Sequence, residues 1–297
     1  MKKSMEAIAL MITSDRSKCR QFVAFMSWAS NLVDEDTNDV PDIFVHDRQT
    51  GETSRVSVTS DGTQADFYST FYPSISAEGR YVAFESWATN LVSGDTNEMG
   101  DIFAHDLQTG ETTRVLVTSG GTQANYFSES PSISADGRYV AFMSFASNLV
   151  DVDTNDVKDI FVHDRQTGET VRVSLASGGS QGNGESRSPS ISADGRFVAF
   201  MSVANNLISG DTNEADDIFV HDRQIGQTER VSVASGGSQG NGWSNFPSVS
   251  AGGRFVAFMS SASNLVSGDS NAEDDIFVHD RVTVGGHLRQ FPTGRLR

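Results

Sequence analysis

The hydrophobic residues of this chain form short runs rather than helical stripes. In a representative stretch, YVAF (residues 139–142) and DIFV (residues 159–162) are apolar at nearly every position, while ETVRVSL (residues 169–175) alternates apolar and polar residues. Continuous runs of this length predict strands buried on both faces, and alternation predicts a strand with one solvent-facing side. The turn signals ADG and RQTG precede the first and last of these runs. The pattern therefore predicts an all-β fold.

The whole pattern recurs five times along the chain. The marker [FY]VAF begins at Phe22, Tyr81, Tyr139, Phe197 and Phe255, at steps of 59, 58, 58 and 58 residues. A fixed period of this length indicates a repeat architecture, in which each repeat buries its apolar faces against its neighbours. We therefore expect one domain over residues 1–297, with repeats at roughly 7–63, 64–121, 122–179, 180–237 and 238–297.

Each repeat supplies four short strands in two hairpins: PSIS before the ADG turn, RYVAFMS after it, then DIFV, and ETVRVSL after the RQTG turn. Propellers typically contain about four to eight blades of four strands each. The sequence therefore predicts a five-bladed β-propeller of four-stranded antiparallel blades. The first repeat lacks PSIS, so we expect residues 7–12 to supply its innermost strand, and we expect residues 287–291 to replace the outer strand of the last repeat. Closed, open and dimer-completed rings are all compatible with these irregular ends.

The run PSISADGRYVAF followed by DIFVHDRQTGET resembles the repeats of the TolB-type β-propellers, and the resemblance extends over residues 22–281. It implies a propeller fold, a binding role and a periplasmic or extracellular location, and it implies no reaction. The chain departs from the TolB pattern in the longer insert SFASNLVDVDTNDVK (residues 144–158) between the second and third strands.

Acidic residues outnumber basic ones, and the formal net charge is −17. This charge argues against a nucleic acid or an anionic membrane as partner, since both require clustered Lys and Arg. No apolar run approaches the roughly 18 residues of a membrane span, so we expect no membrane insertion, and a monomer is favoured. Glu6 interrupts the N-terminal apolar stretch and no small-residue cleavage site follows, so we expect folded chain rather than a signal peptide. Cys19 is the single cysteine, which excludes an intramolecular disulfide.

The insert carries acidic and amide residues at alternate positions, as calcium-binding loops do. The alternative is that these side chains accept hydrogen bonds from backbone amides two residues on and only fix the loop. The other three repeats keep fewer acids, and the glycine and closing glutamate of a calcium loop are missing, so the turn interpretation is favoured for the repeat as a whole. For the first and third repeats both interpretations stay open. The calcium ligands would be Asp34, Asp36, Asn38 and Asp42, and Asp151, Asp153, Asn155 and Asp159.

A histidine precedes an aspartate at the end of every DIFVHD run. Five copies related by the repeat would lie on five different blades, whereas a catalytic group acts once in a site. We therefore expect each imidazole to be hydrogen-bonded between packed sheets, and the aspartate after it to anchor the next turn. The five residues are His46, His105, His163, His221 and His279.

Residues that differ between repeats are better candidates for a site than residues that recur. They cluster in the connection from the outermost strand of one repeat to the innermost strand of the next, on the face of the insert and near the mouth of the axial channel. Exposed aromatic and charged side chains there suit a ligand. The aromatic residues beside proline, Phe71, Tyr72 and Phe246, are expected to pack between blades. The predicted ligand-binding residues are Tyr68, Tyr126, Phe127, Glu129, Glu185, Arg187 and Trp243.

These observations favour a non-catalytic binding module or scaffold that presents its loop face to a protein, peptide or glycan, with calcium as the single cofactor considered. One alternative is a glycoside hydrolase-like enzyme that uses Asp66, Glu129 and Glu185 at the axial channel. The inner strands supply no acid, and neither a G-x-S-x-G nor an HExxH motif occurs, so the enzyme is less favoured. The other alternative is a structural repeat block of a longer secreted protein.

Overall fold

The computed structural model describes residues 21–69, 72–271, 273–282 and 287–291, and every regular element in these ranges is a β-strand. The strands form five antiparallel sheets, and neighbours within each sheet follow chain order or its reverse. No helix in the described ranges has the length and apolar character needed to cross a membrane. The all-β prediction is confirmed.

Each sheet is built from one continuous stretch of the chain. The first contains β1 (Phe22–Ser27), β2 (Asp42–Asp47) and β3 (Thr53–Arg55). The second contains β4 (Ser74–Ile75), β5 (Tyr81–Ser86), β6 (Asp101–Asp106) and β7 (Thr112–Arg114). The third contains β8 (Ser128–Ile133), β9 (Tyr139–Ser144), β10 (Asp159–Asp164) and β11 (Glu169–Arg172). The fourth contains β12 (Ser186–Ile191), β13 (Phe197–Ser202), β14 (Asp217–Asp222) and β15 (Gln227–Arg230). The fifth contains β16 (Ser244–Val249), β17 (Phe255–Ser260), β18 (Asp275–Asp280) and β19 (His287–Phe291).

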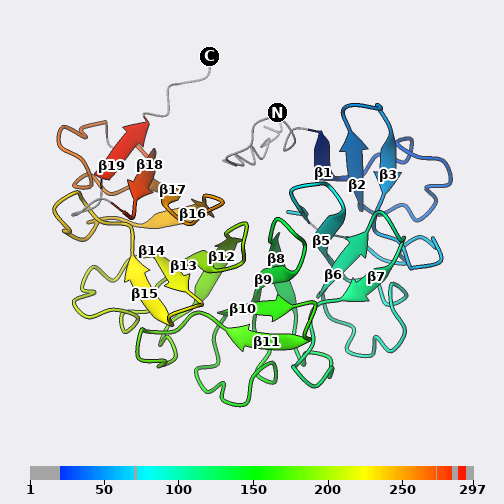
Figure 1. The fold of residues 1–297 in the computed structure, drawn as a ribbon, viewed down its shortest axis with the longest axis horizontal. Coiled ribbons are helices and arrows are strands. Elements are labelled where there is room, and N and C mark those ends of the chain that lie inside the picture. The colour runs from blue at the N-terminus through cyan, green and yellow to red at the C-terminus, as the bar shows by residue number, and fades with distance from the viewer. Residues whose placement is uncertain (1–20, 70–71, 272, 283–286, 292–297) are drawn as a thin grey trace.

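The five sheets follow one another around an arc, in a propeller-like arrangement (Figure 1). Strands β8, β12 and β16 lie toward the centre of the arc, and β7, β11 and β15 lie toward its outside. Strand β19 pairs with β18, so residues 287–291 do replace the regular outer strand. The strand predicted over residues 7–12 lies outside the described residues, and the first sheet has three strands in the described part.

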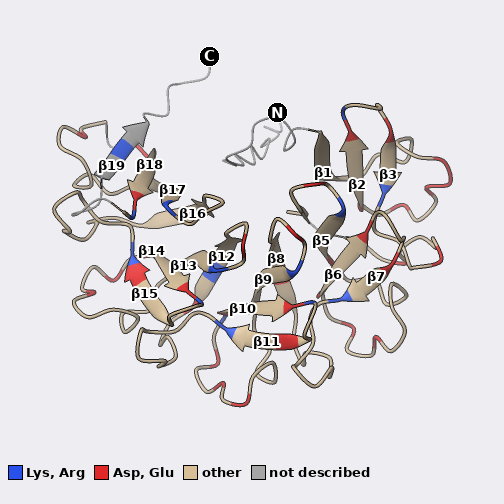
Figure 2. Ribbon diagram, viewed as in Figure 1, with Lys and Arg blue, Asp and Glu red and all other residues tan. Residues whose placement is uncertain are grey.

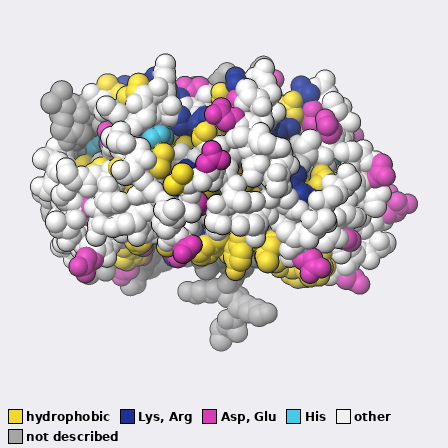
Figure 3. All heavy atoms as spheres, turned by 90° about the horizontal axis from the view of Figure 1, so that it is seen from below, with side chains coloured by type: hydrophobic (Ala, Val, Ile, Leu, Met, Phe, Trp, Pro, Cys, Tyr) yellow, Lys and Arg dark blue, Asp and Glu magenta, His cyan; other side chains and the backbone are white. Residues whose placement is uncertain are grey.

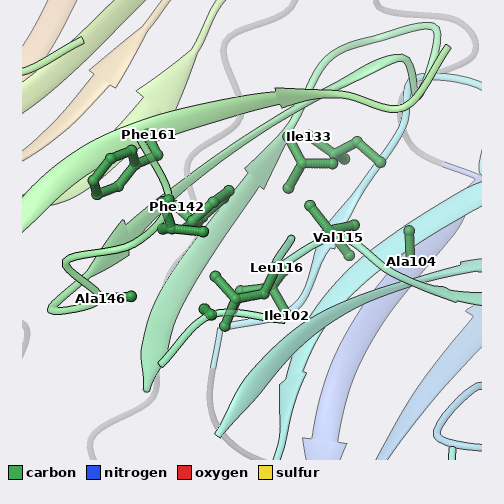
Figure 4. Close-up of a cluster of buried hydrophobic side chains, with 12 residues drawn as sticks. Ile102, Ala104, Val115, Leu116, Ile133, Phe142, Ala146 and Phe161 are labelled. Carbon is green, nitrogen blue, oxygen red and sulfur yellow. The ribbon is translucent and has the colours of Figure 1, made fainter. Parts of the chain in front are cut away.

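Apolar side chains of neighbouring sheets pack against each other and form the core. Between the second and third sheets, Ile102 and Ala104 lie in one cluster with Phe142 and Phe161, and both phenylalanines are fully buried (Figure 4). Burial of one such ring contributes about 1.5–3 kcal/mol relative to its exposure. Both faces of the two middle strands are covered in this way, which explains why YVAF and DIFV do not alternate.

An aromatic residue at the start of the second strand closes the junction to the next repeat. Gly195 has φ 73°, and a Cβ at this position would lie 2.1 Å from Cδ2 of Tyr139. The guanidinium groups of Arg138 and Arg223 lie 4.8 and 4.5 Å from the centroid of the same ring. We call this contact the aromatic seam. The other glycine–ring pairs of this kind are Gly79–Phe22, Gly137–Tyr81 and Gly253–Phe197.

The innermost strands of adjacent sheets are joined by hydrogen bonds. The backbone N–H of Ile191 donates to Ser132 Oγ at 3.1 Å, and the N–H of Ala135 donates to the carbonyl of Ala193 at 3.0 Å. A larger side chain in place of Ser132 would push the two strands apart. The small polar residues of PSIS therefore bring neighbouring sheets close together at their inner ends.

Substitution of the seam glycine tests its role, with Gly226 as a matched control. Both glycines have positive φ, but no atom lies within 4 Å of a Cβ built on Gly226. We expect Gly226→Ala to lower the free energy of unfolding by about 1–2 kcal/mol, the cost of a left-handed alanine. Gly195→Ala should cost a further 1–3 kcal/mol or so because its methyl group overlaps the Tyr139 ring. Urea unfolding measures both, and equal losses would show that the ring contact contributes nothing.

Candidate functional site

The long insert and the connection to the next repeat lie on the same face, as predicted. In the third repeat, Gln181 of the connection donates from Nε2 to Asp153 at 2.7 Å and to Asp159 at 3.2 Å. Its Oε1 accepts the backbone N–H of Thr154 at 3.3 Å. Gln64, Gln123 and Gln239 make the corresponding bonds to the carboxylates of the first, second and fourth repeats.

The carboxylates predicted as calcium ligands hold an arginine. Arg172 Nη1 lies 3.1 Å from Asp153 and 2.9 Å from Asp159, and the three side chains are at most 8% exposed. The guanidinium supplies there the positive charge that a calcium ion would supply. Arg55, Arg114 and Arg230 occupy the same place in the first, second and fourth repeats.

The asparagines of the insert make the predicted turns. Asn155 Oδ1 accepts the backbone N–H of Val157, two residues on, at 3.3 Å, and its Nδ2 donates to Asp159 at 3.1 Å. Corresponding bonds to the residue two positions on form at Asn38, Asn97, Asn213 and Asn271. Asp34 and Asp151 are exposed at the edge of the insert. Within the described ranges no group of three or more His, Cys, Asp or Glu is arranged to hold a metal ion, and calcium at the first and third repeats stays a prediction.

The second repeat differs from the first, third and fourth at one buried position. Ser174 Oγ donates to Asp159, whereas Leu116 takes the place of this serine and leaves Oδ1 of Asp101 buried without a hydrogen-bond partner. Burial raises the pKa of Asp101 to about 6, with Arg114 opposing the rise and Asp95 adding to it. Asp101 is therefore the strained member of this set of carboxylates.

Four of the repeated histidines, His46, His105, His163 and His221, have the expected hydrogen-bond partner, a threonine of the outer strand. At His279 the expectation is wrong, because Leu288 takes the place of the threonine and Nδ1 is buried without a partner.

His163 Nδ1 lies 2.9 Å from Thr170 Oγ1, and that hydroxyl donates to the carbonyl of Val117 in the preceding repeat. Since the hydroxyl proton goes to the carbonyl, Nδ1 is the donor to Thr170. Burial lowers the pKa of His163 to about 4, against the opposing effect of Asp164. The aspartate anchors the next turn as predicted, because Asp164 Oδ1 accepts the backbone N–H of Gln166 at 2.9 Å.

Three positions that vary between repeats lie side by side at the insert end of the sheets. In the second to fifth repeats, a serine of the inner segment pairs with the last residue of the second strand of the sheet. The first variable position is the residue directly before this serine: Tyr68, Phe127, Glu185 and Trp243. The second follows the second strand: Trp87, Phe145, Val203 and Ser261. The third precedes the third strand: Gly100, Lys158, Asp216 and Asp274. Together with the flanking Tyr126, Glu129 and Arg187, we call these residues the variable surface.

Backbone hydrogen bonds connect the three positions. Within the fourth repeat the N–H of Val203 donates to the carbonyl of Glu185 at 3.1 Å. From one repeat to the next, the N–H of Ser186, between Glu185 and Arg187, donates to the carbonyl of Lys158 at 2.8 Å. The variable surface is therefore continuous across repeats, and its side chains stand on a fixed backbone.

The third repeat contributes an aromatic cluster with a cation. The Phe145 ring lies 5.8 Å from the Tyr126 centroid and 5.5 Å from the Phe127 centroid. Lys158 Nζ lies 5.3 Å from the Phe145 centroid and 2.7 Å from Glu129 Oε1. The structure thus brings together the predicted Tyr126, Phe127 and Glu129, and it adds Phe145 and Lys158.

The second repeat contributes aromatic residues alone. The Tyr68 ring lies 4.6 Å from Phe67 and 5.9 Å from Trp87, centroid to centroid. Trp87 Nε1 donates to Glu85 Oε1 at 3.2 Å. Tyr68 is half-buried by these contacts rather than exposed, which differs from the expectation that its ring faces solvent.

The fourth and fifth repeats contribute charges and an indole. Glu185 and Arg187 form an ion pair, and Trp243 is 36% exposed. The carbonyl of Asp216 accepts the N–H of Ser244, the residue after Trp243, at 2.7 Å. The carboxylate of Asp216 is half-buried, and burial raises its pKa while Arg187 opposes the rise.

The expectation that Tyr72 and Phe246 pack between blades is wrong. They are 64% and 60% exposed. Both have positive φ, as does Ser130 at the β-bulge where the register of β8 against β9 shifts. A left-handed residue at a bulge breaks the alternation of side chains and turns its own side chain away from the sheet faces. Phe71 lies outside the described residues.

Several large apolar side chains are exposed at the insert end of the sheets. Figure 3 shows hydrophobic side chains gathered along the lower face in that view, with Lys and Arg toward the upper face. Exposed apolar residues at the insert end include Trp28, Tyr126 and Val203, at 70%, 44% and 46%. Many acidic residues lie in the loops at the outside of the arc (Figure 2).

The sequence singled out only part of this surface. Trp87, Phe145, Lys158 and Asp216 were not predicted because they lie in or beside the insert, whose recurring residues indicated scaffold. A comparison of the repeats position by position reveals these residues. The residue after the last serine of the second strand is Trp87, Phe145, Val203 or Ser261, whereas the residue after that is always alanine.

Replacement of Asp101 by asparagine should change how stability depends on pH. The folded pKa of about 6 lies above the ordinary 3.8, so the wild-type free energy of unfolding falls as pH rises from 3.8 to 6, by about 3 kcal/mol. Asp101→Asn removes this fall. At pH 7 it should lower the free energy of unfolding by less than the control Asp159→Asn does, because the Asp159 carboxylate accepts a hydrogen bond from Ser174. Urea unfolding between pH 4 and 7 measures both, and parallel curves for wild type and Asp101→Asn contradict the assignment.

His163 should destabilise the fold in acid. Its folded pKa of about 4 lies below the ordinary 6.5, so the unfolded chain takes up the proton first and the free energy of unfolding falls as pH drops from 6.5 to 4. The full effect is about 3 kcal/mol. In His163→Gln this contribution is absent, and its curve should be flatter by that amount. An NMR titration that places the His163 pKa near 6.5 overturns the assignment.

Comparison with known proteins places the fold. No family model and no curated protein matches the chain. Among solved structures, TolB from Acinetobacter baumannii is 16% identical over 92% of this chain and 53% of its own, with a TM-score of 0.53. A putative TolB from Agrobacterium tumefaciens is 17% identical over 84% of this chain and 72% of its own, with a TM-score of 0.52. An oligogalacturonate lyase in complex with manganese is 14% identical over 84% of this chain and 58% of its own, also at 0.52. This chain thus spans about half the length of the A. baumannii TolB, and its fold is that of a TolB-like β-propeller.

Proposed function

We propose that this chain is a non-catalytic binding module that holds a protein, peptide or glycan on the variable surface. The observation that carries the proposal is that recurring and variable residues occupy different parts of each sheet. Residues of the seam and of the Arg–Asp–Gln network recur in the repeats, whereas aromatic and charged residues that differ gather on one continuous surface. Variation at fixed positions on a rigid platform is what recognition of one ligand requires.

The chemistry of the surface supports a ligand with flat or apolar parts. Tyr126, at 44% exposure, stands against Phe127 and Phe145, and Trp243 is 36% exposed in the fifth repeat. Tyrosine and tryptophan combine a large apolar area with a hydrogen-bonding group and are enriched where proteins bind partners. The paired charges Lys158 and Glu129 lie next to these rings and add polar specificity.

The proposal includes a wider setting. The five sheets would be the blades of one propeller domain over residues 1–297, in a periplasmic or extracellular protein, and calcium at Asp34 or Asp151 would add rigidity to the insert. The TolB-like fold supports the propeller. The arginine between Asp153 and Asp159 means that calcium would bind in competition with Arg172.

The hydrolase alternative receives less support. Glu129 is bound to Lys158, Glu185 is paired with Arg187, and Asp66 accepts bonds from the backbone and hydroxyl of Thr89 at 2.8 and 2.9 Å. A glycosidase needs one carboxylic acid that gives up its proton and a second carboxylate beside the sugar. Carboxylates that are already engaged by cations and hydrogen-bond donors suit recognition better than acid catalysis.

Binding screens test the proposed function. A displayed peptide library and a glycan array are the probes, applied to wild type and to Tyr126→Ala, Trp243→Ala and the control Val152→Ala, an exposed residue of the insert outside the variable surface. We expect retained probes to lose at least tenfold in affinity on the first two variants and to be unchanged on the control. Retention of no probe, or equal binding by all variants, rejects the proposal. Hydrolysis of a glycoside panel that is lost in Glu129→Gln or Glu185→Gln favours the enzyme instead.

A further inference from the structure

Two aromatic side chains at one repeat-related position are exposed to solvent. Phe67 in the second repeat and Tyr126 in the third are 48% and 44% exposed. The fourth and fifth repeats carry Gly184 and Gly242 at the same position. The exposed rings are therefore a property of two neighbouring repeats, and the shared scaffold does not require them.

The residue before each exposed ring is bonded to the insert. Asp66 Oδ1 accepts the backbone N–H of Thr89 at 2.8 Å, and the N–H of Asp66 donates to Asn90 Oδ1 at 3.0 Å. In the third repeat, Asn125 Oδ1 accepts the backbone N–H of Ser147 at 3.0 Å. Both rings therefore stand on a fixed backbone, although they are exposed.

Further aromatic side chains support each exposed ring. The centroid of Phe67 lies 4.6 Å from that of Tyr68, which in turn stacks on Trp87 at 5.9 Å. The centroid of Tyr126 lies 5.0 Å from that of Phe127. A ring that is packed against other rings keeps its orientation and offers the same flat surface to every ligand.

The aromatic residues of the two repeats are neighbours on the variable surface. The backbone N–H of Ser128 donates to the carbonyl of Gly100 at 2.9 Å. A Cβ at Gly100 would lie 2.7 Å from Trp87 Nε1, so the indole lies directly on this glycine. Ser128 follows Phe127 in the chain. We call the connected residues the aromatic stripe: Phe67, Tyr68, Trp87, Tyr126 and Phe127.

The polar groups beside the aromatic stripe suit a neutral ligand that carries hydroxyl groups. Lys158 binds Glu129 at 2.7 Å, so a basic ligand would compete with a cation that is already in place. The Glu129 side chain is still 33% exposed and can accept a hydrogen bond from a hydroxyl group. The net charge of −17 repels an anionic ligand.

We propose that the ligand of the variable surface is a neutral oligosaccharide, with one sugar ring stacked on Phe67 and another on Tyr126. This inference rests on the proposed function and names the class of its ligand. The C–H groups of a sugar are attracted to the negative face of an aromatic ring, and the hydroxyl groups at its edge donate to Glu129.

A glycan is favoured over an apolar peptide because of the donors at the aromatic stripe. A peptide presents backbone carbonyls, which need N–H donors when they leave water. The indole N–H of Trp87 already donates to Glu85, and the ammonium group of Lys158 already donates to Glu129. Sugar hydroxyl groups bring their own donors to these carboxylates.

Oligosaccharides of equal length and different charge test the inference by calorimetry. The neutral probes are cellohexaose, maltohexaose, mannohexaose and N-acetylchitohexaose, and the anionic probe is hexagalacturonate. We expect at least one neutral probe to bind roughly tenfold more tightly than hexagalacturonate, and Phe67→Ala and Tyr126→Ala each to weaken that probe by roughly tenfold. Tyr126→Phe keeps the ring and should bind as wild type does. The control Phe246→Ala, which removes an exposed ring outside the aromatic stripe, should also leave the affinity unchanged.

The inference is overturned when none of the neutral probes binds, when hexagalacturonate binds equally well, or when both alanine variants keep the wild-type affinity. Peptides that the displayed library retains and that Tyr126→Ala loses, with no glycan retained, also overturn it and leave the proposed function standing. The proposed function fails separately, when no probe of either kind depends on Tyr126 or Trp243.

Discussion

The aromatic seam is the contact on which the rest of the structure depends. One ring, Tyr139 in the third repeat, lies on the backbone of Gly195 and under the guanidinium groups of Arg138 and Arg223. Arg138 also binds Asp164 through Nε and Nη2 at 2.9 and 2.6 Å. Tyr81, Tyr139 and Phe197 share this arrangement of ring, glycine and two arginines, whereas the Phe22 seam keeps the ring and the glycine but has Gln21 and Leu107 in place of the arginines. Loss of the ring or the glycine would separate neighbouring sheets.

The insert end of the sheets is under a different constraint. A buried network of Arg172, Asp153, Asp159 and Gln181 holds the backbone of the insert and of the connection. Side chains that point outward from this network, such as Phe145 and Lys158, take no part in it. They are free to differ between repeats while their positions stay fixed. A surface of this kind is ordered before a ligand arrives, which lowers the entropy cost of binding.

The fold was largely predictable from the sequence, because the apolar runs and the fixed period follow directly from burial of both faces of each sheet. The site was predictable only in part. Alternating Asp and Asn show that a loop needs positive charge, but they do not show which cation supplies it. Arg172 lies in the alternating outer strand, where it has the pattern of a solvent-facing residue, and only the fold brings it to Asp153 and Asp159. A signal did exist, since arginine recurs at this position in four repeats and Gln290 replaces it in the fifth.

Leu116 shows the same limit at a single position. In the sequence, Leu116 looks like an ordinary apolar strand residue, and nothing there shows that its presence in place of serine affects a buried carboxylate. The structure places it against Asp101, whose Oδ1 then lacks the hydroxyl that its counterparts receive. The cost of such a residue depends on a partner 15 residues away, so it becomes visible only when the sheet is assembled.

The repeated contacts do not determine whether the arc of sheets closes into a ring, or with how many sheets. Four seams join the five sheets, and each fixes only the angle between two neighbours. At the fifth sheet Phe255 is 38% exposed, with Arg254 at 4.8 Å as its one guanidinium partner among the described residues. In the sequence, Arg20 stands at the first-repeat position that corresponds to Gly195. A contact that joined the first and fifth sheets would therefore differ from the other four. The residues that the repeats share specify the four junctions between consecutive sheets. Any junction between the first and fifth sheets depends on residues that the repeats do not share.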